Sequence, residues 1–146
     1  MNAQFAFLNS YSPKLAQALR RASSAQCREV EAFALSRVPK DLLAMPEVRA
    51  ALQVFNDERE DGTIAEHLGA LEHRFMRMSD EAAEEGDAGL AEEYFQMQTL
   101  CGGLISVVEN RQLTPNQVDR CLYQLINVML GDHRRDLEEF VEKWGA

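Results

Sequence analysis

Residues 63–109 read TIAEHLGALEHRFMRMSDEAAEEGDAGLAEEYFQMQTLCGGLISVVE, and this stretch decides the fold. In its first half the apolar residues step by four and three positions, which is the spacing of one narrow helical face. These residues are Ile64, Leu68, Leu71, Phe75 and Met78. The second half, from about Gly89 to Glu109, carries a wider apolar face, which suggests contact on more than one side. The sequence therefore predicts two long helices that are joined at Glu85-Gly86-Asp87.

Other helices are marked by their start signals. Ser12-Pro13 and Thr114-Pro115 combine an N-cap residue with a proline that needs no amide partner at the first helical position. Pro46 can begin a further helix, and Asp132 can cap the last one. Thr63, with a glutamate three residues later, matches the capping-box pattern and predicts the start of the first long helix.

The segments between these helices are short. Ser23-Ser24 marks a possible break in the first helical stretch, and Asn56–Gly62 reads as a solvated loop or a frayed helix end. Gly131 is expected to end the helix that begins at Pro115. Phe7 and Leu8, with Phe5, are expected to tuck onto the fold. The adjacent Gly102-Gly103 pair lies inside the predicted central helix, where close approach of a neighbouring helix would explain it best.

Composition and periodicity together define the fold class. The chain has 146 residues, of which 46% are hydrophobic, so it can bury a sizeable core without disulfide or metal staples. No stretch shows sustained alternation of apolar and polar residues, and no hairpin turn separates two strand-like runs. We expect an all-α protein: a single domain over residues 1–146, built as a helical bundle of six or seven helices with short connections.

The cysteines and the hydropathy pattern suggest a location. Cys27, Cys101 and Cys121 are odd in number and lie among apolar neighbours without CxxC spacing, which favours buried thiols in a reducing compartment. No apolar run approaches the roughly 18 residues of a membrane span, and the first residues lack the features of a secretory signal. We expect a cytoplasmic protein.

Negative charge is concentrated in one part of the chain. Residues 1–56 carry seven Lys/Arg and four Asp/Glu, whereas residues 57–146 carry eight and twenty. The densest stretch holds seven carboxylates and no base: Asp80, Glu81, Glu84, Glu85, Asp87, Glu92 and Glu93. A second acidic surface is expected at Asp57, Glu58, Glu60 and Asp61. Such a field repels nucleic acid and anionic lipid and attracts a basic protein surface.

The sequence offers little support for chemistry. None of the three histidines has the acidic residue three positions earlier that a di-iron bundle uses. Glu81, Glu84 and Glu85 could belong to a magnesium-dependent hydrolase, but a second acidic pair to face them is missing, and a solvated acidic corner is the favoured interpretation. No phosphate loop or nucleophile motif is present. We therefore expect no catalytic residue, metal or cofactor.

Protein binding is the function that this pattern favours. We expect an acidic module that inhibits or masks a partner by docking on its basic surface, one that normally handles nucleic acid or nucleotides. Immunity proteins and phage anti-defence proteins are examples of this physical type. The sequence leaves two alternatives open: a self-assembling structural or adaptor protein that forms a homodimer through the apolar faces of helices 89–109 and 115–130, and the metal-dependent hydrolase.

Overall fold

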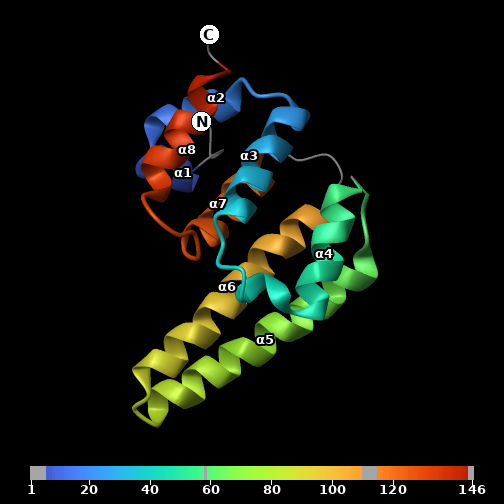
Figure 1. The fold of residues 1–146 in the computed structure, drawn as a ribbon, viewed down its shortest axis with the longest axis vertical. Coiled ribbons are helices and arrows are strands. Elements are labelled where there is room, and N and C mark those ends of the chain that lie inside the picture. Colours follow the sequence, from blue (N-terminus) through green and yellow to red (C-terminus); the bar gives the residue numbers. More distant parts are fainter. Residues whose placement is uncertain (1–5, 58, 110–114, 145–146) are drawn as a thin grey trace. The chain divides into compact units, whose positions relative to one another are not determined.

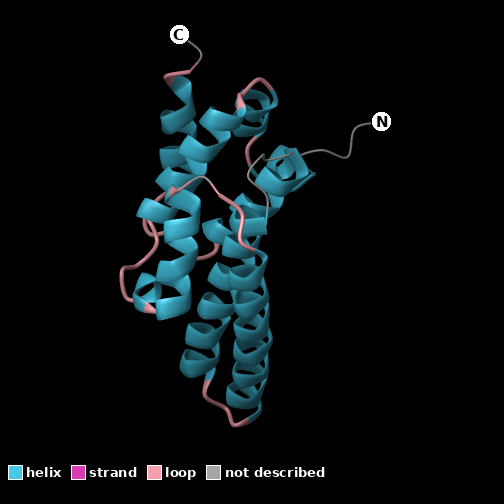
Figure 2. Cartoon of the chain, turned by 90° about the vertical axis from the view of Figure 1, so that its right-hand side faces the viewer, coloured by secondary structure: helices cyan, strands magenta, loops and turns pink. Residues whose placement is uncertain are grey.

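The protein is predominantly helical in the part that the structure describes. The computed structural model describes residues 6–57, 59–109 and 115–144, and these residues form eight α-helices and one short 3-10 helix, without a strand (Figure 2). The predicted all-α fold is confirmed, and the helix count is close to the expected six or seven. Within the described ranges, no helix is both long enough and apolar enough to cross a bilayer.

The chain divides into two compact units, one formed by residues 1–39 with 112–146 and the other by residues 40–111. The single domain expected over residues 1–146 stays a prediction. The first unit contains five helices: α1 (Ala6–Tyr11), α2 (Pro13–Arg20), α3 (Ser24–Ser36), α7 (Pro115–Ile126) and α8 (His133–Glu142). In this unit α7 packs against α1 and α3, and α8 packs against α2 and α3. Fully buried leucines from four of these helices, Leu8, Leu15, Leu122 and Leu137, form much of its core.

The predicted start signals operate in this unit. The Ser12 side chain accepts a hydrogen bond from the Leu15 amide at 3.1 Å and caps α2. Ser23 and Gln26 form a reciprocal capping box at the start of α3, which confirms the expected break at Ser23-Ser24. Asp132 caps α8, as predicted.

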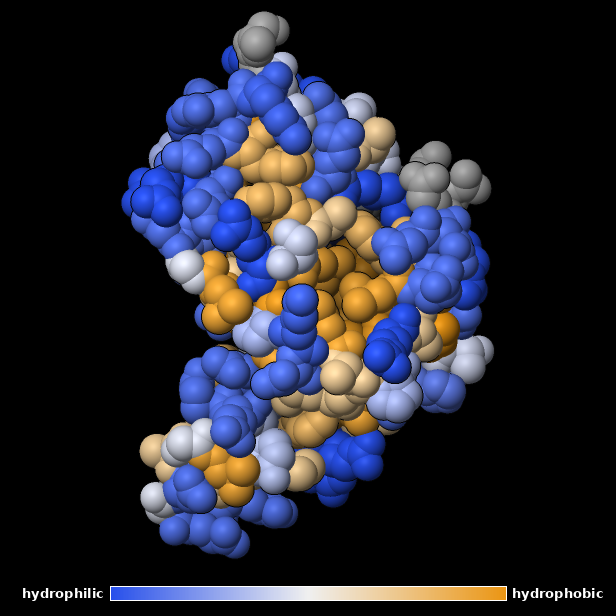
Figure 3. Space-filling view, viewed as in Figure 1, coloured by the Kyte–Doolittle hydropathy of each residue, from blue (hydrophilic) through white to orange (hydrophobic). Residues whose placement is uncertain are grey.

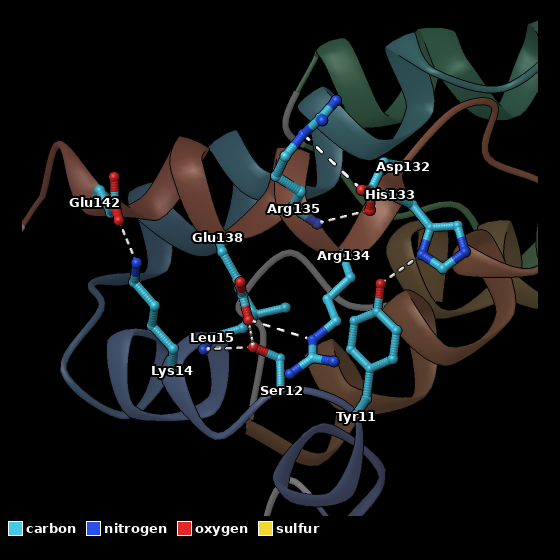
Figure 4. A network of polar contacts seen from close by, with 10 residues as sticks. All are labelled: Tyr11, Ser12, Lys14, Leu15, Asp132, His133, Arg134, Arg135, Glu138 and Glu142. Atoms are coloured by element: carbon cyan, nitrogen blue, oxygen red, sulfur yellow. Dashed lines mark hydrogen bonds and ion pairs between the residues drawn. The ribbon is translucent and has the colours of Figure 1, made fainter.

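Ser12 also joins α2 to α8. Its buried hydroxyl donates a hydrogen bond to the Glu138 carboxylate, which in turn pairs with Arg134 at 3.5 Å (Figure 4). Lys14 of α2 pairs with Glu142, which lies one turn after Glu138 on α8 (Figure 4). The N-cap is therefore part of a polar connection between two helices that are far apart in the sequence.

Replacing Ser12 with alanine is expected to lower the free energy of unfolding by about 2 kcal/mol, because the variant loses the cap and leaves the Glu138 carboxylate without its buried donor. Urea denaturation of the variant and of wild type measures the change. Ser24→Ala is the control, because Ser24 is exposed at the first position of α3 and is not that helix's cap. Equal effects of the two substitutions would contradict the role given to Ser12.

The first unit differs from prediction in two places, at α1 and at the end of α7. α1 was not expected as a helix. The Asp119 carboxylate of α7 accepts hydrogen bonds from the amides of Leu8 at 2.9 Å and Phe7 at 3.3 Å, and these bonds hold the first turn of α1. α7 ends at Ile126 and not next to Gly131. The chain leaves the helix early because the Leu130 amide donates to the Arg37 carbonyl at 2.9 Å, a tertiary contact that periodicity cannot reveal. The start expected at Thr114 and the position of Phe5 lie outside the described residues.

The second unit is built on a long helical hairpin. Its elements are η1 (Leu42–Ala44), α4 (Pro46–Asn56), α5 (Gly62–Glu84) and α6 (Ala88–Glu109). α5 and α6 lie side by side along their lengths and are joined by a tight turn, as predicted (Figure 1, green and yellow to orange). α4 packs against both of them. The Asp61 side chain caps α5 by accepting from the Ile64 amide at 3.1 Å, so the helix starts before the predicted Thr63.

The two halves of this hairpin are buried to different degrees. In the half near α4, Leu68, Leu100 and Leu104 are fully buried, and Leu71 nearly so. From residue 72 to residue 98, a range that the structure describes completely, Ala82 is the one buried residue. The far half of the hairpin is therefore much less buried than the half near α4, and most of its residues are exposed or half-buried. Gly102 and Gly103 lie in the other half of α6, where Gly103 is buried, and the close approach of a neighbouring helix that was expected there stays a prediction.

Candidate functional site

The candidate site is the end of the α5–α6 hairpin, and its turn is rigidly built. Gly86 has φ +84°, a conformation that glycine adopts without strain. The Asp87 amide donates to the Ala82 carbonyl at 2.9 Å, and the Gly86 amide donates to the Ala83 carbonyl at 3.1 Å. These two bonds form a Schellman motif, which satisfies the last carbonyls of α5 and reverses the chain.

Side chains strengthen the same turn. The Asp87 carboxylate accepts from the Leu90 amide at 3.0 Å and so caps the start of α6. The Ser79 hydroxyl donates to the Ala91 carbonyl at 2.8 Å and links the two helices just before the turn. Phe75 and Tyr94 stack between the helices with ring centroids 6.2 Å apart. The hairpin end thus holds its side chains in a defined arrangement.

All seven predicted acids of this stretch lie on the hairpin end, and all are exposed: Asp80, Glu81, Glu84, Glu85, Asp87, Glu92 and Glu93. Asp87 has a structural role as a cap, but Glu81, Glu84 and Glu85 sit in or next to the last turn of α5. Negative charge there opposes the helix macrodipole and costs roughly 0.3–1 kcal/mol per residue. The ion pairs of the described residues include none of these three glutamates. Their charge therefore faces solvent.

The second predicted acidic surface is used locally. Asp57 and Asp61 both pair with Arg59, at 3.4 and 3.2 Å. The hydrogen bond from the Ile64 amide, with a smaller contribution from Arg59, holds the pKa of Asp61 below its usual value. Glu60 is exposed, and Glu58 lies outside the described residues. Because one arginine balances part of this charge and Asp61 serves α5 as its cap, the hairpin end is the better candidate for a partner.

A groove that the sequence did not predict lies among the hairpin acids. The groove has a volume of about 460 Å³ and a floor of small residues from both helices and the turn, namely Ala83, Gly86, Ala88 and Ala91. Phe95 and Glu92 line it on α6, and Phe95 is 42% exposed. Figure 3 shows apolar surface enclosed by hydrophilic residues toward the end of the hairpin. The pattern contained a signal, because Phe95 broadens the apolar face of a helix segment that has few partners.

The acids and the cysteines are the side chains that a metal-dependent or thiol-based enzyme would use. Within the described residues, no group of three or more His, Cys, Asp or Glu is placed to hold a metal ion. Glu81, Glu84 and Glu85, which were considered as a magnesium site, therefore do not form such a group. The three cysteines are free and buried, as predicted. Burial raises the pKa of the Cys27 thiol to about 11 and that of Cys101 to about 12. Such thiols stay protonated near neutral pH, and a protonated thiol is a poor nucleophile.

A second unpredicted feature is a carboxyl group in the core of the first unit. Glu31 of α3 is 0% exposed, and neither of its oxygens has a nitrogen or oxygen partner within the described residues. Burial raises its pKa to about 8, although a hydrogen bond with the Cys121 thiol and the charge of Arg28 act in the opposite direction. Glu31 lies in the apolar stripe that contains Cys27, Val30 and Ala34, so this face of α3 includes one acid. It is therefore largely protonated at neutral pH.

Comparison of the chain with known protein families, with curated proteins and with solved structures gave no match.

Proposed function

We propose that the protein is a binding module that docks the acidic end of its α5–α6 hairpin on a basic surface of another protein. One observation carries the proposal. Seven exposed carboxylates are gathered on a rigid turn, three of them at a helix end where they cost stability. Charge kept at such a cost is typical of surfaces selected for recognition and not for folding.

Docking of this kind inhibits or masks the partner. A basic groove that handles nucleic acid or nucleotides attracts phosphate, and an acidic hairpin that occupies it excludes the phosphate. The role is that of immunity proteins and phage anti-defence proteins, and we place it in the cytoplasm. The self-assembly alternative is less favoured, because Val118, Leu122 and Leu125 of α7 and Leu104 of α6 are buried within the chain and are not available to a second copy.

The proposal is tested by the salt dependence of partner binding. The partner is first captured on the immobilised protein from the native cytoplasm and is then purified. We expect its association rate to fall roughly tenfold between about 50 and 500 mM NaCl, with a much smaller change in the dissociation rate, because salt screens long-range attraction. Stopped-flow or surface-plasmon measurements separate the two rates. An association rate that is independent of salt would contradict electrostatic docking.

A further inference from the structure

The far half of the α5–α6 hairpin lacks the third helix that the other half possesses. At the end of the hairpin away from the turn, α4 packs against both α5 and α6, and leucines of both helices are fully buried there. Toward the turn, among the described residues of this second unit, no third helix covers α5 and α6 in this way, and from residue 72 to residue 98 Ala82 alone is buried. The same pair of helices is thus completed by a third helix at one end and left open at the other.

The open end is shaped to receive a helix. Ala83, Ala88 and Ala91 give the groove a floor of small side chains, and Gly86 adds none. Small residues let a second backbone approach closely, so a helix can lie in such a groove with its side chains between α5 and α6. Phe95 stands beside this floor and is 42% exposed, which gives an incoming apolar side chain an aromatic surface to pack against.

Charge selects the kind of helix. Glu92 lines the groove itself, and exposed Glu81, Glu84, Glu85 and Glu93 belong to the same hairpin end. A second copy of this chain would bring the same acids to the same place, and its net charge is −9, so self-association here is disfavoured. A helix with one apolar face and lysines or arginines flanking it satisfies both the groove and its surroundings.

We propose that the hairpin end binds a basic amphipathic helix of a partner protein, which lies in the groove between α5 and α6 and acts there as the third helix. This inference rests on the proposed docking function and specifies the partner's element. The uncovered half of α5 has about 13 residues, or roughly 20 Å, so a helix of about four turns fills it.

Two synthetic peptides of about 15 residues provide the test. Both contain the same numbers of lysine and leucine; in one the leucines form a single helical face, and in the other they are distributed around the helix. We expect the amphipathic peptide to bind at least about tenfold more tightly than its isomer, measured by fluorescence anisotropy. In ¹H–¹⁵N spectra it is expected to shift the amide signals of Ala88 and Ala91.

Two matched variants locate the apolar contact. Phe95→Ala is expected to remove the preference for the amphipathic peptide, whereas Met76→Ala is expected to keep it. Met76 is 39% exposed on α5 and does not line the groove, so the two substitutions remove similar exposed apolar side chains. Because neither residue is buried, both variants are expected to keep the melting temperature of wild type within a few degrees.

Equal affinity of the two peptides for wild type overturns the helix-in-groove inference, and so does the absence of binding by both at about 1 mM. Equal effects of Phe95→Ala and Met76→Ala overturn it as well. None of these results decides the proposed docking function, which fails separately if association with the captured partner is independent of salt.

Discussion

Replacing Glu31 with leucine is expected to stabilise the protein, and by an amount that grows with pH. The buried carboxyl has no polar partner among the nitrogen and oxygen atoms of the described residues, and burial raises its pKa to about 8. An unfolded chain releases this proton near pH 4.3. Between these two pH values the folded state therefore holds a proton that the unfolded state has lost.

The stability that Glu31 contributes decreases as the pH rises. Because the unfolded state binds fewer protons, the contribution of Glu31 to the free energy of unfolding is greatest below about pH 4, falls as the pH rises, and is lost once the pH passes the folded pKa of about 8. The full loss is on the order of 5 kcal/mol. Leucine has no proton to release, so the advantage of Glu31→Leu over wild type is expected to be several kcal/mol larger at pH 9 than at pH 5.

Urea denaturation at pH 5, 7 and 9 measures this difference. The control is Glu29→Leu, which removes an exposed acid two positions away on the same helix and is expected to show no comparable growth with pH. Stability curves of wild type and Glu31→Leu that run parallel from pH 5 to 9 would contradict a buried, protonated Glu31.

The second large effect concerns binding. The triple variant Glu81→Lys/Glu84→Lys/Glu85→Lys is expected to weaken the complex with the captured partner by at least about 100-fold, because it sets positive charge against a basic surface. The fold is expected to remain, and the melting temperature to stay equal or rise, because lysines complement the macrodipole at the end of α5. Affinity and thermal unfolding together separate lost recognition from lost structure.

A matched control separates position from net charge. Glu29→Lys/Glu66→Lys/Glu139→Lys changes the net charge by the same amount at exposed residues on α3, α5 and α8. It is expected to lower the affinity only a few-fold, through the weaker overall field. If the two triple variants weaken binding equally, the hairpin end has no special role.

Helix existence was predictable where local chemistry specifies it. Ser12 and Pro46 begin α2 and α4 as predicted, because N-caps and first-turn prolines act within a few residues of chain. The turn at Gly86 was predictable for the same reason. Elements held by distant partners were not: α1 depends on Asp119, more than a hundred residues away, and the early end of α7 depends on Arg37.

The candidate site was predictable in its charge but not in its shape. A run of seven acids near a glycine turn indicates an exposed surface, and all seven are exposed. The groove beside Phe95 depends on how far α4 extends along the hairpin, which periodicity does not specify. Glu31 carried a readable signal, an acid in an apolar stripe, but its burial depends on how α3 packs against α7.

Site-specific photo-crosslinking in the native cytoplasm tests the central claim most directly. A photoreactive amino acid replaces Ala83, which is exposed and lines the groove, and in a control protein it replaces Ala32, which is exposed on α3. We expect the first protein to form one salt-sensitive adduct, with the crosslink mapped to a lysine- and arginine-rich segment of the partner. An adduct of equal yield from Ala32, or a crosslink from Ala83 to an acidic or uncharged segment, would contradict the claim that the hairpin end is the docking site.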